Sequence, residues 1–124
     1  MALILVIDDD RDVCAVAQDV LVSAGHQVAI ANDGAQGLEL QRKAPADVVI
    51  TDILMPEKEG LETIRDLKRD FPKVRIIAMS GMGKQLKSTA YLVTARELGA
   101  DVVLRKPFGS ATLLQSVQEL LHST

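Results

Sequence analysis

The sequence predicts a doubly wound α/β fold, a (βα)5 sandwich in which helices cover both faces of a five-stranded parallel sheet. Short apolar runs rich in β-branched residues recur five times along the chain, and each is too short for a helix. Segments with apolar residues at helical spacing follow these runs, which favours parallel strands joined by right-handed crossovers. With 124 residues, 48% hydrophobic and 25% charged, the chain can bury one core, so we predict a single domain over residues 1–124.

Composition argues against several classes of function. The net charge of −3 and the sequence pI near 5.3 give no general attraction to nucleic acid or to anionic membranes. Cys14 is the only cysteine, which rules out an internal disulfide and favours a reducing compartment. No apolar run approaches the roughly 18 residues that cross a bilayer, and Ala2–Ile7 is too short for a signal peptide. We therefore expect a cytoplasmic protein with no direct contact to nucleic acid or membrane.

The first half of the chain contains three predicted strands: Leu3–Ile7, Gln27–Ala31 and Asp47–Thr51. After the first strand, Asp10 caps a helix that Gly25 ends. The apolar residues of this helix recur at helical spacing: Val13, Val16, Ala17, Val20, Leu21 and Ala24. After the second strand, Asn32-Asp33-Gly34 leads into a helix that runs to about Ala44, where Pro45 ends it.

The third predicted strand is followed by a turn at Met55–Gly60 and then by another helix. One face of this helix is apolar: Leu61, Ile64 and Leu67. Phe71-Pro72 ends it, and Val74–Met79 is the fourth predicted strand.

Ser80-Gly81-Met82-Gly83 then forms a junction with two glycines. The next helix lies within Lys84–Leu98, and Gly99 ends it before the fifth predicted strand, Asp101–Leu104. A turn at Lys106–Gly109 precedes the last helix. Its apolar stripe comprises Leu113, Leu114, Val117, Leu120 and Leu121.

Five polar residues come at the carboxyl ends of predicted strands: Asp8, Asp9, Asp52, Ser80 and Lys106. Ligands of open parallel sheets bind at this edge. Taken singly, four of these residues have ordinary explanations. Asp8 and Asp9 could cap a helix that follows the strand, Ser80 could be an ordinary loop residue, and Lys106 could be a solvated surface charge. Asp52 is different, since it precedes a Met-Pro turn rather than a helix start. The coincidence of all five at one edge favours a functional site.

This set of side chains suits phosphoryl chemistry on a carboxylate. Clustered carboxylates raise one another's pKa unless a cation sits among them, and Mg²⁺ prefers oxygen ligands together with a phosphate oxygen. A lysine and a hydroxyl across the site would contact the remaining oxygens of a phosphoryl group. An ionised carboxylate can itself be the nucleophile and form an acyl phosphate without a general base.

The chain resembles the response-regulator receiver domains of two-component signalling along its whole length. The resemblance is carried by these motifs: Ile4-Leu5-Val6-Ile7-Asp8-Asp9-Asp10, Asp52-Ile53-Leu54-Met55-Pro56 with Gly60, Ser80-Gly81, Gly99-Ala100-Asp101 and Lys106-Pro107-Phe108. It implies a flavodoxin-like (CheY-like) fold with strand order 2-1-3-4-5. It also implies a cis peptide bond between Lys106 and Pro107.

The resemblance further implies a role for each site residue. Asp52 would be the phosphoacceptor, and Ser80 and Lys106 would contact the phosphoryl group. Asp8, Asp9 and Asp52, together with the backbone carbonyl of Leu54, would bind Mg²⁺.

The function implied is that of a signalling switch rather than a turnover enzyme. A phosphohistidine on a sensor histidine kinase or phosphotransfer protein would donate the phosphoryl group, and the domain would assist its own modification. Phosphorylation would then change binding to a downstream effector domain or protein, which the sequence does not identify. Transcription-factor members of the family often dimerise through charged residues of the fourth helix, fifth strand and fifth helix, and a homodimer through that face is one expectation. The charged pattern is thin here, so the alternative is an apolar face for another partner, formed by Leu86, Tyr91, Val102 and Val103.

The chain departs from the family pattern at two places that affect how phosphorylation changes partner binding. Val103 stands where the family usually carries an aromatic switch residue on the fifth strand, three positions before the lysine. It is either a silent substitution in a buried strand or a change in how phosphorylation alters partner binding. The segment from Ser80 to Gly99 is longer than usual by roughly one helical turn. The extra residues fall around Gly81–Ser88, and Tyr91 is a candidate replacement aromatic.

Two other functions remain as alternatives. One is a receiver-like interaction module that is not phosphorylated, although all five site residues are present. The other is an aspartate-nucleophile phosphatase, which would require a second aspartate two residues after Asp52, where this chain has Leu54. We also expect the chain to be part of a longer regulator, because it ends where the last helix should end.

Overall fold

The computed structural model describes residues 2–53, 60–81 and 93–122. Its centre is a five-stranded parallel sheet in the order β2-β1-β3-β4-β5. The strands are β1 (Leu3–Ile7), β2 (Gln27–Ala31), β3 (Val48–Asp52), β4 (Arg75–Ser80) and β5 (Val102–Arg105). The predicted doubly wound fold and its strand order are confirmed.

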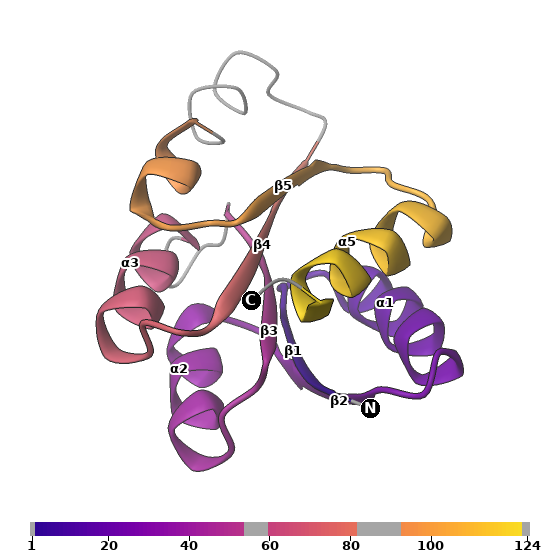
Figure 1. Ribbon diagram of the computed structural model, residues 1–124, viewed down its shortest axis with the longest axis horizontal. Coiled ribbons are helices and arrows are strands. Elements are labelled where there is room, and N and C mark those ends of the chain that lie inside the picture. The colour runs from indigo at the N-terminus through magenta and orange to yellow at the C-terminus, as the bar shows by residue number, and fades with distance from the viewer. Residues whose placement is uncertain (1, 54–59, 82–92, 123–124) are drawn as a thin grey trace.

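Helices cover both faces of the sheet, as Figure 1 shows. They are α1 (Arg11–Ser23), α2 (Gly34–Lys43), α3 (Gly60–Asp70) and α5 (Ser110–His122). α1 and α5 lie on one face and α2 and α3 on the other, with the helical residues 93–98, drawn in orange, on the α3 side. The helix predicted within 84–98 is therefore confirmed for its last part, and the rest lies outside the described residues. No helix in the described ranges has the length and hydrophobicity to cross a membrane.

The core has two layers because side chains alternate between the faces of each strand. The layer under α1 and α5 contains Ile4, Val6, Cys14, Ala17, Leu21, Val48, Ile50, Ile77, Met79, Leu113, Val117 and Leu120. The layer under α2 and α3 contains Leu5, Ile7, Leu38, Val49, Ile53, Ile64, Leu67, Ile76, Ala78 and Ala95, among others. Each strand thus packs into both layers, which is why its sequence is apolar throughout.

The predicted helix signals lie at the helix ends. The Asp10 side chain accepts hydrogen bonds from the N–H groups of Asp12 and Val13, and so caps α1. The Asp33 side chain accepts a bond from Gln36 N at 2.8 Å and caps α2 in the same way. Gly99, which follows the helical residues 93–98, has a φ of 125°, a left-handed conformation that glycine adopts without strain.

β3, β4 and β5 each begin and end one residue later than predicted. Asp47 and Asp101, the predicted first residues of β3 and β5, lie just before these strands. Their side chains accept hydrogen bonds from main-chain N–H groups of neighbouring strands. The Leu3 N–H donates to Asp47 Oδ2 at 3.0 Å, and the Ile76 N–H donates to Asp101 Oδ2 at 2.8 Å. One consequence is that Asp52 and Ser80 are the last residues of β3 and β4 rather than the first residues after them.

Candidate functional site

Three of the five predicted site residues project from the same face of the sheet. Side chains two residues apart share a face of a strand, and Val6, Ile50 and Leu104 all pack into the layer under α1 and α5. Asp8, Asp52 and Lys106 each come two residues after one of these, at the carboxyl ends of β1, β3 and β5, and so point to the same face. The same alternation places Ser80 on the opposite face, with Ala78.

The acidic part of the site consists of three carboxylates. One oxygen from each of Asp8, Asp9 and Asp52 can be chosen so that all three lie within 4.8 Å of one another. Asp8 is 0% and Asp52 6% exposed, whereas Asp9 is exposed to solvent. The cluster therefore has two buried members and one that faces water.

Lys106 supplies the positive charge beside this cluster. Its Nζ lies 2.6 Å from Asp8 Oδ2 and 3.6 Å from Asp52 Oδ2. The other oxygen of Asp8, Oδ1, accepts a hydrogen bond from the Asp10 N–H at 2.9 Å. The buried carboxylate of Asp8 is thus held by an ammonium group and a main-chain N–H.

The pKa values of Asp8 and Lys106 follow from this arrangement. Burial raises the pKa of Asp8, and the hydrogen bonds from Lys106 and from the Asp10 N–H only partly oppose it. Burial also opposes the charge of Lys106, but its hydrogen bond to Asp8 and the charges of Asp52, Asp8 and Asp10 together raise its pKa. Lys106 is therefore protonated at neutral pH.

Ser80 lies at the end of β4 and is fully buried. Its hydroxyl donates to the Gly81 carbonyl at 3.4 Å, and its own carbonyl accepts a bond from the Lys106 N–H at 2.8 Å. Val103 packs, partly buried, against the core layer under α2 and α3. The Lys106–Pro107 bond is cis, as the resemblance implied.

Cys14 contacts the site in a way that the sequence pattern did not reveal. Its thiol is buried in α1, 3.4 Å from the main-chain oxygen of Asp8. Burial, with the nearby charges of Asp8 and Asp10, raises the pKa of this thiol to about 11, so it stays protonated at neutral pH. No spacing rule in the sequence predicts this contact, because it arises from the packing of α1 on the end of β1.

Other predicted features lie outside the described residues. They include the backbone carbonyl of Leu54, most of the turn at Met55–Gly60, most of the lengthened segment Gly81–Ser88, and Tyr91. Gly60 is described, and it is the first residue of α3 rather than part of the turn.

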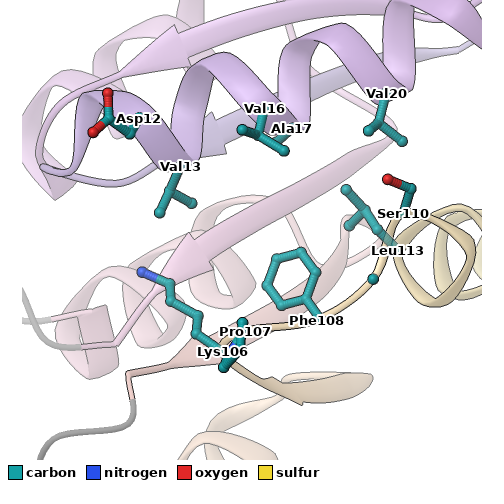
Figure 2. A pocket seen from close by; sticks show the side chains of 11 residues that line it. Asp12, Val13, Val16, Ala17, Val20, Lys106, Pro107, Phe108, Ser110 and Leu113 are labelled. Atoms are coloured by element: carbon teal, nitrogen blue, oxygen red, sulfur yellow. The ribbon is translucent and has the colours of Figure 1, made fainter.

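An apolar groove of about 270 Å³ lies next to the acidic cluster. α1 forms one wall, with Val13, Val16 and Val20, and the segment from Lys106 to Leu113 forms the other. Figure 2 shows the Phe108 ring opposite α1 within this groove. Val16 is 62% exposed, so apolar surface is open to solvent beside the site.

In chemical terms, the site is a set of hard oxygen donors beside one fixed ammonium group. Carboxylate oxygens are the ligands that a hard divalent cation such as Mg²⁺ prefers, so the residues present fit such an ion. The ammonium group of Lys106, together with a cation held by the carboxylates, could neutralise the charge of an anionic group bound beside them.

Comparison with known proteins adds to this description. The family model described as "Response regulator receiver domain" matches residues 4–118. The transcriptional regulatory protein CpxR of Escherichia coli (strain K12) is 32% identical over 122 residues, which cover 98% of this chain and 50% of CpxR. The chemotaxis protein CheY of Bacillus subtilis (strain 168) is 32% identical over 120 residues, which cover 96% of this chain and 97% of CheY. The chain thus spans about half the length of CpxR and almost all of CheY.

Solved structures share the fold over nearly the whole chain. The receiver domain of NtrX from Brucella abortus matches with a TM-score of 0.90 and 25% identity, covering 98% of this chain and 99% of that domain. A CheY-like response regulator receiver domain protein from Methanospirillum hungatei JF-1 matches with a TM-score of 0.90 and 26% identity, covering 98% and 94% of the two chains. These matches confirm the flavodoxin-like fold.

Proposed function

Because this chain belongs to the family of response-regulator receiver domains, we propose that it is a phosphorylation switch with Asp52 as the phosphoacceptor. The observation that carries this assignment is the position of Asp52, which is buried, belongs to the acidic cluster with Asp8 and Asp9, and has its Oδ2 3.6 Å from Lys106 Nζ. Receiver domains are signalling modules, and the proposed reaction modifies the domain itself rather than turning over a substrate.

In the proposed reaction, a carboxylate oxygen of Asp52 attacks the phosphorus atom of a phosphohistidine on a sensor histidine kinase or phosphotransfer protein. The new P–O bond forms as the P–N bond breaks, and the electron pair of that bond leaves with the imidazole ring of the donor. Lys106 neutralises the charge of the bound phosphoryl group. For Ser80 to donate its hydroxyl to a phosphoryl oxygen, that hydroxyl must leave the Gly81 carbonyl, 3.4 Å away, and turn toward Asp52. Asp8 and Asp9, with the carbonyl of Leu54, would hold Mg²⁺, which neutralises phosphoryl charge.

The donor must reach Asp52 from the solvent side of the site, and the apolar groove beside Lys106 supports contact there. We propose that the donor protein covers α1 and the segment from Lys106 to Leu113. Phosphorylation of Asp52 then changes the binding of this domain to an effector domain or protein. We propose that this takes place in the cytoplasm and that the domain itself does not contact nucleic acid. The homodimer through the fourth helix, β5 and α5 stays a prediction, because much of the fourth helix lies outside the described residues.

Phosphorylation can be tested with a small phosphodonor. In the presence of Mg²⁺ and acetyl phosphate, the protein should gain one phosphoryl group, and Asp52→Asn should gain none, because the amide is not a nucleophile. Intact-protein mass spectrometry measures the gain. The absence of any gain would favour the unphosphorylated interaction module, and continuous phosphate release at enzyme-like rates would favour the phosphatase.

Magnesium should stabilise the folded protein, because an ion that binds only the native state adds RT ln(1 + [L]/Kd) to the free energy of unfolding. At ten times Kd the gain is about 1.4 kcal/mol, visible as a rise in melting temperature of several degrees. Asp9→Asn should abolish the rise without unfolding the protein, since Asp9 is exposed. Asp19 is an exposed aspartate of α1 that lies outside the cluster, so Asp19→Asn should show the same rise in melting temperature as the unmodified protein. An equal rise in both variants would contradict the proposed metal site.

A further inference from the structure

Two neighbouring groups contact one main-chain atom of the proposed phosphoacceptor, the carbonyl oxygen of Asp52. The Thr51 hydroxyl donates a hydrogen bond to this oxygen at 3.1 Å, and Thr51 is fully buried. Gly60 packs against the same oxygen from α3. A Cβ atom at Gly60 would collide with Asp52 O and with Ile53 Cα. The carbonyl therefore lies between a hydroxyl group and a glycine.

Hydrogen bonds hold the next residue on both sides. The Ile53 N–H donates to the Met79 carbonyl of β4 at 3.0 Å. The Gly60 N–H donates to the Ile53 carbonyl at 3.2 Å, which ties the start of α3 to the chain just beyond β3. The main chain at residues 52 and 53 is thus fixed by β4 on one side and by α3 on the other.

We propose that Thr51 and Gly60 are positioning residues, which hold the Asp52 main chain so that its carboxylate stays beside Asp8 and Lys106. Such support is needed because Asp52 is the last residue of β3, where the strand ladder ends. Alternation along the strand directs Thr51 and Asp52 to opposite faces, so Thr51 acts through the main chain rather than on the reacting atoms. The role of this support in phosphorylation rests on the proposed function. The contacts of Thr51 and Gly60 with the Asp52 carbonyl are observed independently of that proposal.

The hydroxyl of Thr51 can be removed almost without a change of shape. Thr51→Val is nearly isosteric and lacks the donor, whereas Thr51→Ser keeps the donor and loses one methyl group. We expect Thr51→Val to gain a phosphoryl group from acetyl phosphate about tenfold more slowly, and to bind Mg²⁺ about tenfold more weakly. Thr51→Ser should stay within about twofold of the unmodified protein in both measurements. Intact mass and titration calorimetry with MgCl₂ provide the two values.

A control variant that destabilises the core without touching the Asp52 carbonyl shows whether a slower phosphorylation comes from lost positioning of Asp52 or from a general loss of stability. Val49→Ala lies on the same strand and face as Thr51 and is fully buried, yet it leaves the Asp52 carbonyl untouched. It should lower the melting temperature and leave both the phosphorylation rate and the Mg²⁺ affinity unchanged. If Thr51→Val does not fold, Thr51→Ala also lacks the hydroxyl and takes its place.

The outcomes distinguish this inference from the proposed function. Normal rates and Mg²⁺ affinity in Thr51→Val, or an equal loss in Val49→Ala or Thr51→Ser, would overturn the positioning role. If the unmodified protein gains no phosphoryl group, the proposed function fails, but the Mg²⁺ affinities of the same variants still decide whether Thr51 positions Asp52.

Discussion

Gly60→Ala is expected to lower the free energy of unfolding by about 3 kcal/mol and to slow phosphorylation of Asp52 at least about tenfold. The added Cβ would overlap the Asp52 carbonyl oxygen and Ile53 Cα, which are main-chain atoms that no rotamer change can move aside. Either α3 or the end of β3 must shift, and both changes displace the Asp52 carboxylate. Urea denaturation and intact-mass kinetics with acetyl phosphate measure the two effects.

Gly81→Ala provides the matched control. Among the described residues, a Cβ atom at Gly81 would meet nothing within 4 Å, and the φ of Gly81 lies outside the left-handed region. This variant should unfold within about 0.5 kcal/mol of the unmodified protein. Similar stability losses for the two glycine variants would mean that the close approach of Gly60 to Asp52 is not the cause.

Much of the site could be predicted from the sequence because it depends on local rules. The strands are short apolar runs, and the last apolar residue of each run locates the edge of the sheet. The structure brings Asp8, Asp52 and Lys106 together at this edge, with Lys106 Nζ 2.6 Å from Asp8 Oδ2 and 3.6 Å from Asp52 Oδ2. The caps formed by Asp10 and Asp33 follow from their positions directly before helical segments.

The features that the sequence did not predict depend on contacts between distant elements. The side chains of Asp47 and Asp101, which directly precede β3 and β5, accept hydrogen bonds from N–H groups of the neighbouring strands β1 and β4. The contact between Gly60 and Asp52 depends on how α3 packs against β3, which no local pattern encodes.

The cause of the raised pKa of Asp8 also differs from the expectation. The sequence suggested repulsion among the carboxylates, but burial is the largest cause and the charge of Asp9 is the smallest. Burial at this position results from the way β1, α1 and β5 close around the residue, so it requires the folded structure.

Lys106→Met is expected to lower the free energy of unfolding at neutral pH by about 3 kcal/mol, measured by urea denaturation in EDTA. The substitution removes the ammonium group that lies 2.6 Å from the fully buried carboxylate of Asp8. Asp8→Asn should restore most of the loss, because the buried charge is then absent as well. A double-mutant cycle with these two variants measures the coupling between the two residues. Lys43→Met is the control, since Lys43 pairs with Glu39 at 3.4 Å on the surface and should cost about 0.5 kcal/mol or less.

The loss caused by Lys106→Met should grow as pH rises from about 4 towards neutrality. The pKa of Asp8 in the folded protein is already raised by burial, so its carboxyl favours folding most when protonated, and this contribution is lost as pH rises through the raised pKa. Lys106 opposes the rise by its hydrogen bond and its charge, so without it the pKa of Asp8 rises further. Stability is then lost over a wider pH range, and the total loss at neutral pH is larger. A stability difference that stays constant over this pH range, or one that persists in the Asp8→Asn background, would show that Lys106 stabilises the fold by packing rather than by its charge.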